Sequence, residues 1–202
     1  TAVSVATDAI DRLHTTAESH DRVMVVEVMG RHVGHIALWA GIAGGATMTL
    51  IPEEPFDIAE VAEALVRRHK RGKYASIVVV AEGARPAPGT LDIPEPEVDQ
   101  YGHKRLGGIS NVISSEIEQR TGYETRVTVL GHVQRGGTPT AFDRVLCTWY
   151  GVEAIDAVHD GAFGTMVALQ NAEVVRVPLE IAVAELKYVN PRLYEAAKVF
   201  FS

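Results

Sequence analysis

The sequence holds one cysteine, Cys147, among 202 residues. A single thiol cannot close an internal disulfide, which argues against a disulfide scaffold and favours a reducing compartment. Cys147 lies in an apolar helical pattern with Val145 and Leu146, so we expect it to be a small buried core residue. No apolar run approaches the roughly 20 residues of a membrane span, and no leader-like segment opens the sequence. We therefore expect a cytoplasmic protein with no membrane partner.

Positive charge is also scarce. Lys and Arg total 19 against 26 Asp and Glu, which gives a formal net charge of −7. Nucleic acid and anionic membranes select basic faces, so we expect no nucleic-acid partner, and any anion site must be local. Neither usual nucleotide loop, G-x-x-x-x-G-K-[ST] or G-x-G-x-x-G, occurs. His32 and His35 lie three residues apart, but no cysteine or carboxylate completes a ligand set, and we predict no metal site.

The sequence does contain alternating strand and helix patterns. Three long apolar runs, at 22–28, 75–82 and 124–130, are typical of strands buried on both faces. Two shorter runs, at 48–52 and 165–170, also indicate strands. Helical periodicity fills the intervals, over about 1–16, 32–45, 55–73, 107–121 and onward to about 159, with a short C-terminal helix. Residues 83–106 are proline-rich and loop-like. This alternation predicts an α/β fold with a parallel sheet covered by helices on both faces.

Polar residues follow each of the three long strand patterns. Arg31 follows the first, Glu82 ends the second, and His132 and Arg135 follow the third. Ligands of open α/β sheets bind beyond the carboxyl ends of the strands, so these side chains share one rim if the three strands are neighbours. Any one of them could be an ordinary solvated loop residue. The same feature at three strand ends favours a ligand site.

The residue types at this rim indicate the ligand class. Arg135 offers a bidentate guanidinium fork and His132 a directional donor, a combination that suits a phosphomonoester. The Glu82 carboxylate is suited instead to accepting hydrogen bonds from hydroxyls. The set therefore fits a phosphorylated sugar or polyol, and glycines such as Gly30 and Gly137 would let the backbone approach it closely.

Three further charged residues belong to the strand patterns themselves. Arg22 and Arg126 stand at the starts of their strands, so we expect them at the opposite edge of the sheet, away from the rim of their own subunit. Glu27 lies inside the first strand, and we expect it to be structural and paired with a nearby arginine.

Long stretches of the sequence resemble the C-terminal part of 6-phosphofructokinases of the bacterial type: VVEVMGRHVGHIALWAGIAGGA, IPEEPFDI and RVTVLGHVQRGGTPTAFDR. The last stretch carries the signature of that family: Arg126, four residues, Gly131-His132, then Gln134-Arg135-Gly136-Gly137, five residues and Asp143-Arg144. The resemblance covers essentially the whole chain and is weakest over 83–106. It implies the C-terminal portion only of a parallel-sheet, Rossmann-like phosphofructokinase fold.

The resemblance also implies residue roles, all of them in substrate binding. Met29, Gly30 and Arg31 would hold fructose 6-phosphate near the transferring phosphoryl group. Glu82 would bind the sugar hydroxyls, and His132 with Arg135 the 6-phosphate. Arg22 and Arg126 would reach into the site of a neighbouring subunit, as in a homotetramer with shared sites. No catalytic or metal-binding residue of this chain follows from the resemblance.

The implied function is the acceptor-substrate half of an enzyme that phosphorylates fructose 6-phosphate to fructose 1,6-bisphosphate in glycolysis. Its Mg²⁺ and its donor, ATP or pyrophosphate, would be bound mainly by an N-terminal half outside this chain, which alone would be inactive. Residues 1–133 would form the sugar-phosphate domain, 134–183 a segment of the nucleotide-binding domain, and 184–202 the return to the first domain. The alternative is a noncatalytic sugar-phosphate-binding or regulatory subunit.

Overall fold

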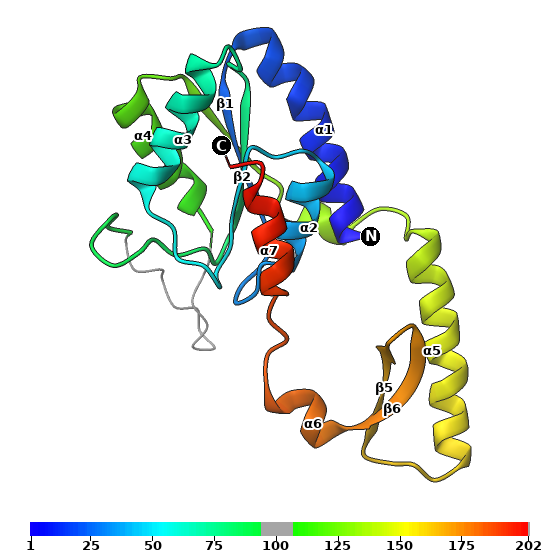
Figure 1. Cartoon of the computed structure of the whole chain (residues 1–202). Coiled ribbons are helices and arrows are strands. Elements are labelled where there is room, and N and C mark those ends of the chain that lie inside the picture. Colours follow the sequence, from blue (N-terminus) through cyan, green and yellow to red (C-terminus); the bar gives the residue numbers. More distant parts are fainter. Residues whose placement is uncertain (94–106, 202) are drawn as a thin grey trace. The chain divides into compact units, whose positions relative to one another are not determined.

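A computed structural model of the chain describes residues 1–93 and 107–201 (Figure 1). The chain divides into two compact units. The first, the sheet unit, comprises Ala2–Gly137 and Tyr188–Ser202, and the second, the hairpin unit, comprises Thr1 and Thr138–Lys187. The part of the predicted proline-rich loop from 94 to 106 lies outside the described residues.

Four parallel strands form the core of the sheet unit, in the order β2-β3-β1-β4. Their bounds are β1 Val23–Val28, β2 Met48–Leu50, β3 Ser76–Ala81 and β4 Thr125–Val129. Every residue of β1 and β3 is buried, as expected of central strands that are covered on both faces. The predicted parallel sheet is confirmed.

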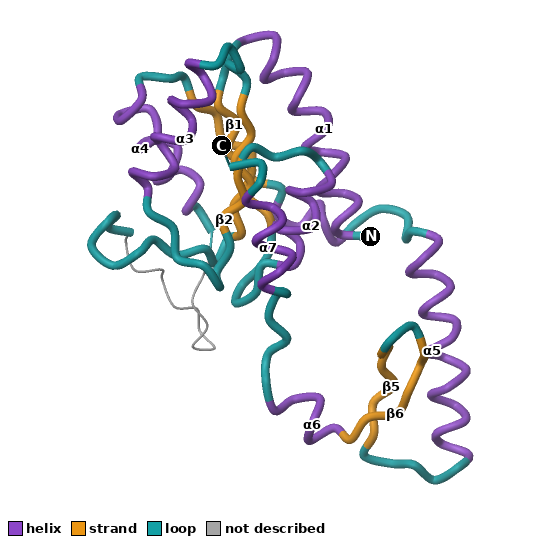
Figure 2. The backbone as a smooth tube through the Cα atoms, viewed as in Figure 1, coloured by secondary structure: helices purple, strands orange, loops and turns teal. Residues whose placement is uncertain are grey.

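Helices cover both faces of this sheet (Figures 1 and 2). Their bounds are α1 Ala2–His20, α2 His35–Ala43 and α7 Pro191–Lys198 on one face, and α3 Ile58–Lys70 and α4 Ile109–Thr121 on the other. Alternate β1 residues divide between the two resulting cores, because side chains alternate across a strand. Met24 and Val26 pack with α1, α2 and α7, whereas Val23 and Val25 pack with α3 and α4.

Two carboxylates fix the starts of the helices on the second face. The Asp57 Oδ1 atom accepts the Ala59 N–H at 2.8 Å and caps α3. Glu27, only 2% exposed, accepts the N–H groups of Gly108 and Ser110 at 3.1 Å at the start of α4. The expectation that Glu27 pairs with an arginine is therefore wrong. The unpaired amides of a helix N-terminus neutralise this carboxylate instead.

The hairpin unit contains a long helix and a two-stranded antiparallel sheet. Its elements are α5 Ala141–His159, β5 Thr165–Gln170, β6 Glu173–Pro178 and α6 Leu179–Ala184. The strand expected at 165–170 is present, but its partner β6 was not predicted. Arg176 on β6 joins the hairpin to α5 through ion pairs with Glu153 at 2.6 Å and Asp160 at 2.8 Å.

Cys147 on α5 is exposed, which contradicts the expected core position. Within the described residues of this helix only Ala157 is buried, and apolar side chains such as Trp149 and Val152 are exposed. The hairpin contacts one side of α5, so the apolar pattern around Cys147 extends beyond what the hairpin can cover. Across 1–93 and 107–201, no helix is both long and apolar enough to cross a membrane.

Candidate functional site

The carboxyl ends of β3, β1 and β4 lie side by side in the sheet unit. Val28 at the end of β1 is in register with Ala81 of β3, and Glu27 with Val129 of β4. The three strands are therefore neighbours, which is the condition for the polar residues after them to share one rim. The segments that leave them at this edge are Met29-Gly30-Arg31, Glu82-Gly83 and the 3₁₀ helix η1 Gly131–Arg135.

Glu82 connects the β1 and β3 ends directly. Its Oε1 atom accepts the Gly30 N–H at 3.3 Å. Gly83 permits a close approach of the two loops, because a Cβ atom there would lie 2.1 Å from the Arg31 carbonyl oxygen. The backbone of the segment from Met29 to Arg31 is thus held against the end of β3 by one carboxylate and one glycine.

Gln134 connects the β1 and β4 ends in the same way. Its side chain is buried, at 1% exposure, although it lies in a loop motif. Its Oε1 atom accepts the Met29 N–H at 3.2 Å, and its Nε2 donates to the Gly131 carbonyl at 3.0 Å. The sequence interpretation missed this role. The signal was present in the quoted motif, where Gln134 is the uncharged polar residue between His132 and Arg135.

A second carboxylate fixes the far end of the loop after β1. Glu53 accepts the Gly34 N–H with both carboxylate oxygens, at 3.1 and 3.0 Å, where α2 begins. It also accepts the Val189 N–H at 3.3 Å from the returning C-terminal segment. Gly34 packs so closely on Ile51 that an added Cβ atom would lie 2.5 Å from it. Sequence reasoning did not identify Glu53 either, because its partners lie far away along the chain.

Three side chains with nitrogen donors at this edge are available to a ligand. Arg31, His132 and Arg135 are exposed, and none makes a hydrogen bond or ion pair with another residue that the structure describes. Together with half-buried Glu82 and Met29, they provide donors for an anion and an acceptor for hydroxyls. The edge therefore combines a fixed backbone with side-chain nitrogen donors that have no partner among the described residues.

Arg22 and Arg126 lie at the opposite edge, at the starts of β1 and β4. The Arg22 Nε donates to Glu124 Oε2 at 2.8 Å, and Arg126 Nη2 donates to the other oxygen of the same carboxylate. The hydrogen bond from Arg22 and the charge of Arg126 lower the pKa of Glu124. These two arginines do not join the other predicted residues within one copy of the sheet unit.

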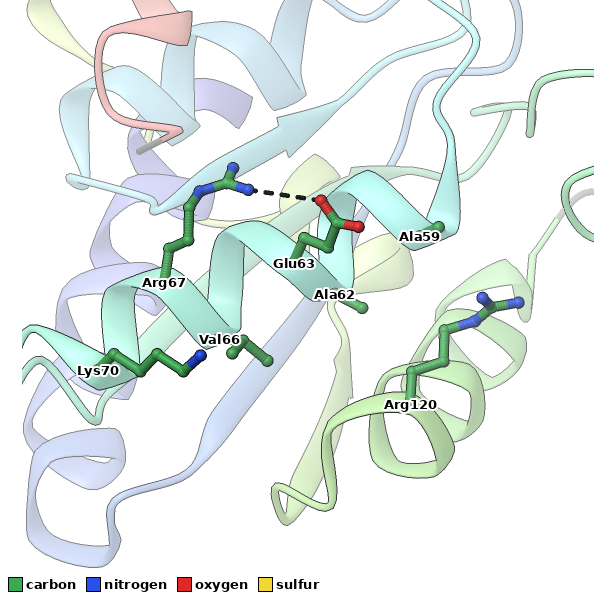
Figure 3. A pocket seen from close by; sticks show the side chains of 7 residues that line it. All are labelled: Ala59, Ala62, Glu63, Val66, Arg67, Lys70 and Arg120. Atoms are coloured by element: carbon green, nitrogen blue, oxygen red, sulfur yellow. Dashed lines mark ion pairs between the residues drawn. The ribbon is translucent and has the colours of Figure 1, made fainter.

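A separate groove of about 490 Å³ runs between α3 and α4 (Figure 3). Ala59, Ala62 and Val66 are among its apolar lining residues, and Lys70 and Arg120 are among its cations. None of the predicted site residues lines this groove. Among the residues described, no group of three or more His, Cys, Asp or Glu side chains is placed to hold a metal ion.

Comparison with known proteins identifies the family of this fold and site. The phosphofructokinase family profile matches residues 1–158. The chain belongs to the phosphofructokinase family. It is 59% identical over 201 residues to the pyrophosphate–fructose 6-phosphate 1-phosphotransferase of Streptomyces coelicolor, covering 100% of this chain and 58% of that protein. It is 57% identical over 201 residues to the ATP-dependent 6-phosphofructokinase of Mycobacterium leprae, covering 100% of this chain and 59% of that protein.

Solved structures agree with this assignment. The phosphofructokinase of Saccharomyces cerevisiae matches with a TM-score of 0.75 and 37% identity, over 98% of this chain and 24% of that chain. The pyrophosphate-dependent phosphofructokinase of Nitrosospira multiformis matches with a TM-score of 0.78 over 100% of this chain and 53% of that chain. Its 19% identity supports the fold alone. The predicted family and parallel-sheet phosphofructokinase fold are confirmed, and the chain spans about 58% of its curated relatives, consistent with a C-terminal portion.

Proposed function

We propose that this chain is the acceptor-substrate part of a cytoplasmic glycolytic phosphofructokinase, which phosphorylates fructose 6-phosphate to fructose 1,6-bisphosphate. One observation carries the proposal. The segment Met29-Gly30-Arg31 is held by Glu82 and Gln134 at the same sheet edge that presents Arg31, His132 and Arg135 without partners among the described residues. The names of the relatives support the same substrate.

Each predicted residue has a chemical task in this proposal. Arg135 and His132 bind the 6-phosphate, because a guanidinium fork and an imidazole N–H match phosphate oxygens. Glu82 already accepts the Gly30 N–H with Oε1, and its other oxygen is suited to a sugar hydroxyl. Arg31 supplies positive charge beside the phosphoryl group that is being transferred, where negative charge must be neutralised.

The phosphoryl donor and Mg²⁺ belong elsewhere in the proposal. The relatives include both ATP-dependent and pyrophosphate-dependent enzymes, so either donor fits the family. The carboxylates and imidazoles of the described segments do not form a metal-binding group. We assign donor and metal binding mainly to an N-terminal half, and this chain alone should show no phosphotransfer.

The proposed domain division assigns 1–133 to the sugar-phosphate domain, 134–183 to the nucleotide-binding domain, and 184–202 to the return segment. The exposed apolar residues of α5 support it, because a helix with an apolar surface requires further protein to cover it. Trp149, Val152 and Ile155 are three of these residues. Contacts with the remainder of the nucleotide-binding domain would bury them.

The last component of the proposal is a homo-oligomer with shared substrate sites. Arg22 and Arg126 lie at the sheet edge opposite to His132, so a phosphate bound by all three groups must sit between two copies. In this arrangement one subunit supplies the loops after β1, β3 and β4. Its neighbour supplies the two arginines.

Fructose 6-phosphate titration of the full-length protein tests the proposal. Arg135→Ala should raise the half-saturating concentration about 10- to 100-fold, as expected for a lost charge-assisted phosphate contact. Lys70→Ala is the matched control, because Lys70 is an exposed cation of the α3–α4 groove (Figure 3). Unchanged binding in Arg135→Ala would contradict the proposed site. Binding without product formation from ATP or pyrophosphate would favour a noncatalytic sugar-phosphate-binding subunit.

A further inference from the structure

Glu124 bridges the two arginines at the amino-terminal edge of the sheet. Its Oε2 atom accepts the Arg22 Nε–H at 2.8 Å, and its Oε1 atom accepts Arg126 Nη2–H. Both interactions are ion pairs. One carboxylate therefore brings two like-charged side chains from adjacent strands to a common point, although like charges alone would repel each other.

The backbone around this bridge is fixed by the sheet. The Val23 N–H donates to the Glu124 carbonyl at 3.0 Å, and the Ser76 N–H donates to the Arg22 carbonyl at 3.3 Å. Val23 is in register with Thr125 on the adjacent strand. Glu124 immediately precedes β4, and the hydrogen bond from Val23 ties its main chain to the start of β1, which holds the carboxylate in place.

The bridge leaves both guanidinium groups able to bind a ligand. Arg22 uses Nε, so both of its terminal amino groups keep their N–H donors. Arg126 uses Nη2 for Glu124 and Nη1 for the Thr125 carbonyl at 3.2 Å, which leaves Nε and one hydrogen on each amino group. The carboxylate orients the arginines without occupying all of their donors.

We propose that Glu124 is a positioning residue that orders Arg22 and Arg126 in advance for the phosphate carried by a second copy of this chain. The inference rests on the proposed function. Without the bridge, substrate binding must immobilise two long side chains, exposed Arg126 and half-buried Arg22, and each immobilisation weakens binding by roughly two- to tenfold. A carboxylate also repels a bound phosphate, but water screens that repulsion at this exposed edge. The gain in affinity from ordering the two arginines should therefore exceed the loss from this repulsion.

The experiment replaces Glu124 in the full-length protein. Glu124→Gln keeps the shape and removes the charge, and it should raise the half-saturating fructose 6-phosphate concentration roughly three- to tenfold. The turnover number and the half-saturating donor concentration should stay as in the wild type. Glu124→Asp, which keeps the charge, should recover part of the affinity. Glu116→Gln is the matched control, because Glu116 forms its ion pair with Arg120 on α4 and not with either arginine of the bridge.

A mixing experiment tests the action across subunits. Oligomers that combine Glu124→Gln with His132→Ala should regain some sites of wild-type affinity, because one interface then pairs an intact loop edge with an intact arginine bridge. Arg126→Ala, measured in parallel, separates the shared substrate site from the positioning role of Glu124. If Arg126→Ala weakens binding and Glu124→Gln leaves it unchanged or tightens it, the positioning role is wrong and the shared site stands. If neither variant weakens binding, the shared site and the inference both fail.

Discussion

The Met29 N–H donates to the buried Oε1 atom of Gln134 across 3.2 Å, from the end of one strand to the end of its neighbour. Removal of this acceptor in Gln134→Ala leaves a partly buried amide and the Gly131 carbonyl without their partner. We expect a loss of about 1–3 kcal/mol in the free energy of unfolding and weaker fructose 6-phosphate binding. Urea unfolding and substrate titration measure these effects. Gln119→Ala on the exposed surface of α4 is the control.

Gly83 should not tolerate a side chain. In Gly83→Ala the new Cβ atom would meet the Arg31 carbonyl oxygen at 2.1 Å, so the backbone must move. We expect destabilisation of about 1–3 kcal/mol and a higher half-saturating fructose 6-phosphate concentration, because Arg31 moves with its carbonyl. Gly151→Ala has no atom within 4 Å of the new Cβ and serves as the control. Wild-type binding and stability in Gly83→Ala would show that the loops are not packed as described.

Glu27 should contribute strongly to stability. Its carboxylate accepts the first amides of α4, and its burial leaves no water to replace it. Glu27→Ala is expected to lower the free energy of unfolding by about 2–4 kcal/mol. Glu63→Ala, which removes an exposed carboxylate from an ion pair with Arg67, should cost less than about 1 kcal/mol. Equal effects of the two substitutions in urea unfolding would contradict the capping role.

Tyr194 should make stability fall at alkaline pH. Burial raises the pKa of its hydroxyl from 10.0 to about 12, and the charges of Glu54 and Glu195 add to this. Because the unfolded chain releases the phenolic proton first, the contribution is complete below pH 10.0 and is lost as pH rises towards about 12. Tyr194→Phe should flatten this part of the stability profile in urea unfolding. If Tyr194→Phe loses stability at alkaline pH as the wild type does, Tyr194 is not the cause of that loss.

Shared sites predict complementation between two defective subunits. Arg126→Ala removes a cation from one edge of the sheet, and His132→Ala removes a donor from the other. Each homo-oligomer should bind fructose 6-phosphate about 10- to 100-fold more weakly. Mixed oligomers should recover some sites of normal affinity. If mixtures bind no better than either parent, Arg126 belongs to the same site as His132 or to none.

The central strands and the ends that carry the site were predictable from sequence. β1 and β3 each contain five apolar residues out of six and are covered on both faces, so their composition marks them as buried strands. Glu82 directly follows β3 and Arg31 lies three residues after the end of β1. Parallel strands bring their carboxyl ends to one edge. These inferences need only local pattern and one rule of topology.

Features that depend on distant partners were not predictable. Glu27 meets Ser110, 83 positions away. The helix over 107–121 was predicted, but no local pattern shows that its start will lie against Glu27. The β5–β6 turn places Asn171 and Ala172 at φ values of 50° and 68°, and alanine gives no signal for such a turn. Cys147 lies within an apolar helical pattern but is exposed, because such a pattern does not show which element covers the helix. The burial of Gln134 depends on the 3₁₀ helix η1, which the sequence did not predict.

β1 has Arg22 immediately before it and Met29 immediately after it. The seven residue steps from Arg22 to Met29, at roughly 3.3 Å each, span about 23 Å. In an assembly with shared sites, this span is the spacer from one substrate to the next. Insertion of one residue would exchange the faces of Met24 and Val25 and disrupt both cores, so the spacing cannot drift by single steps. In an assembly with shared sites, the two hydrophobic cores would thus fix the distance between neighbouring substrates through the length of β1.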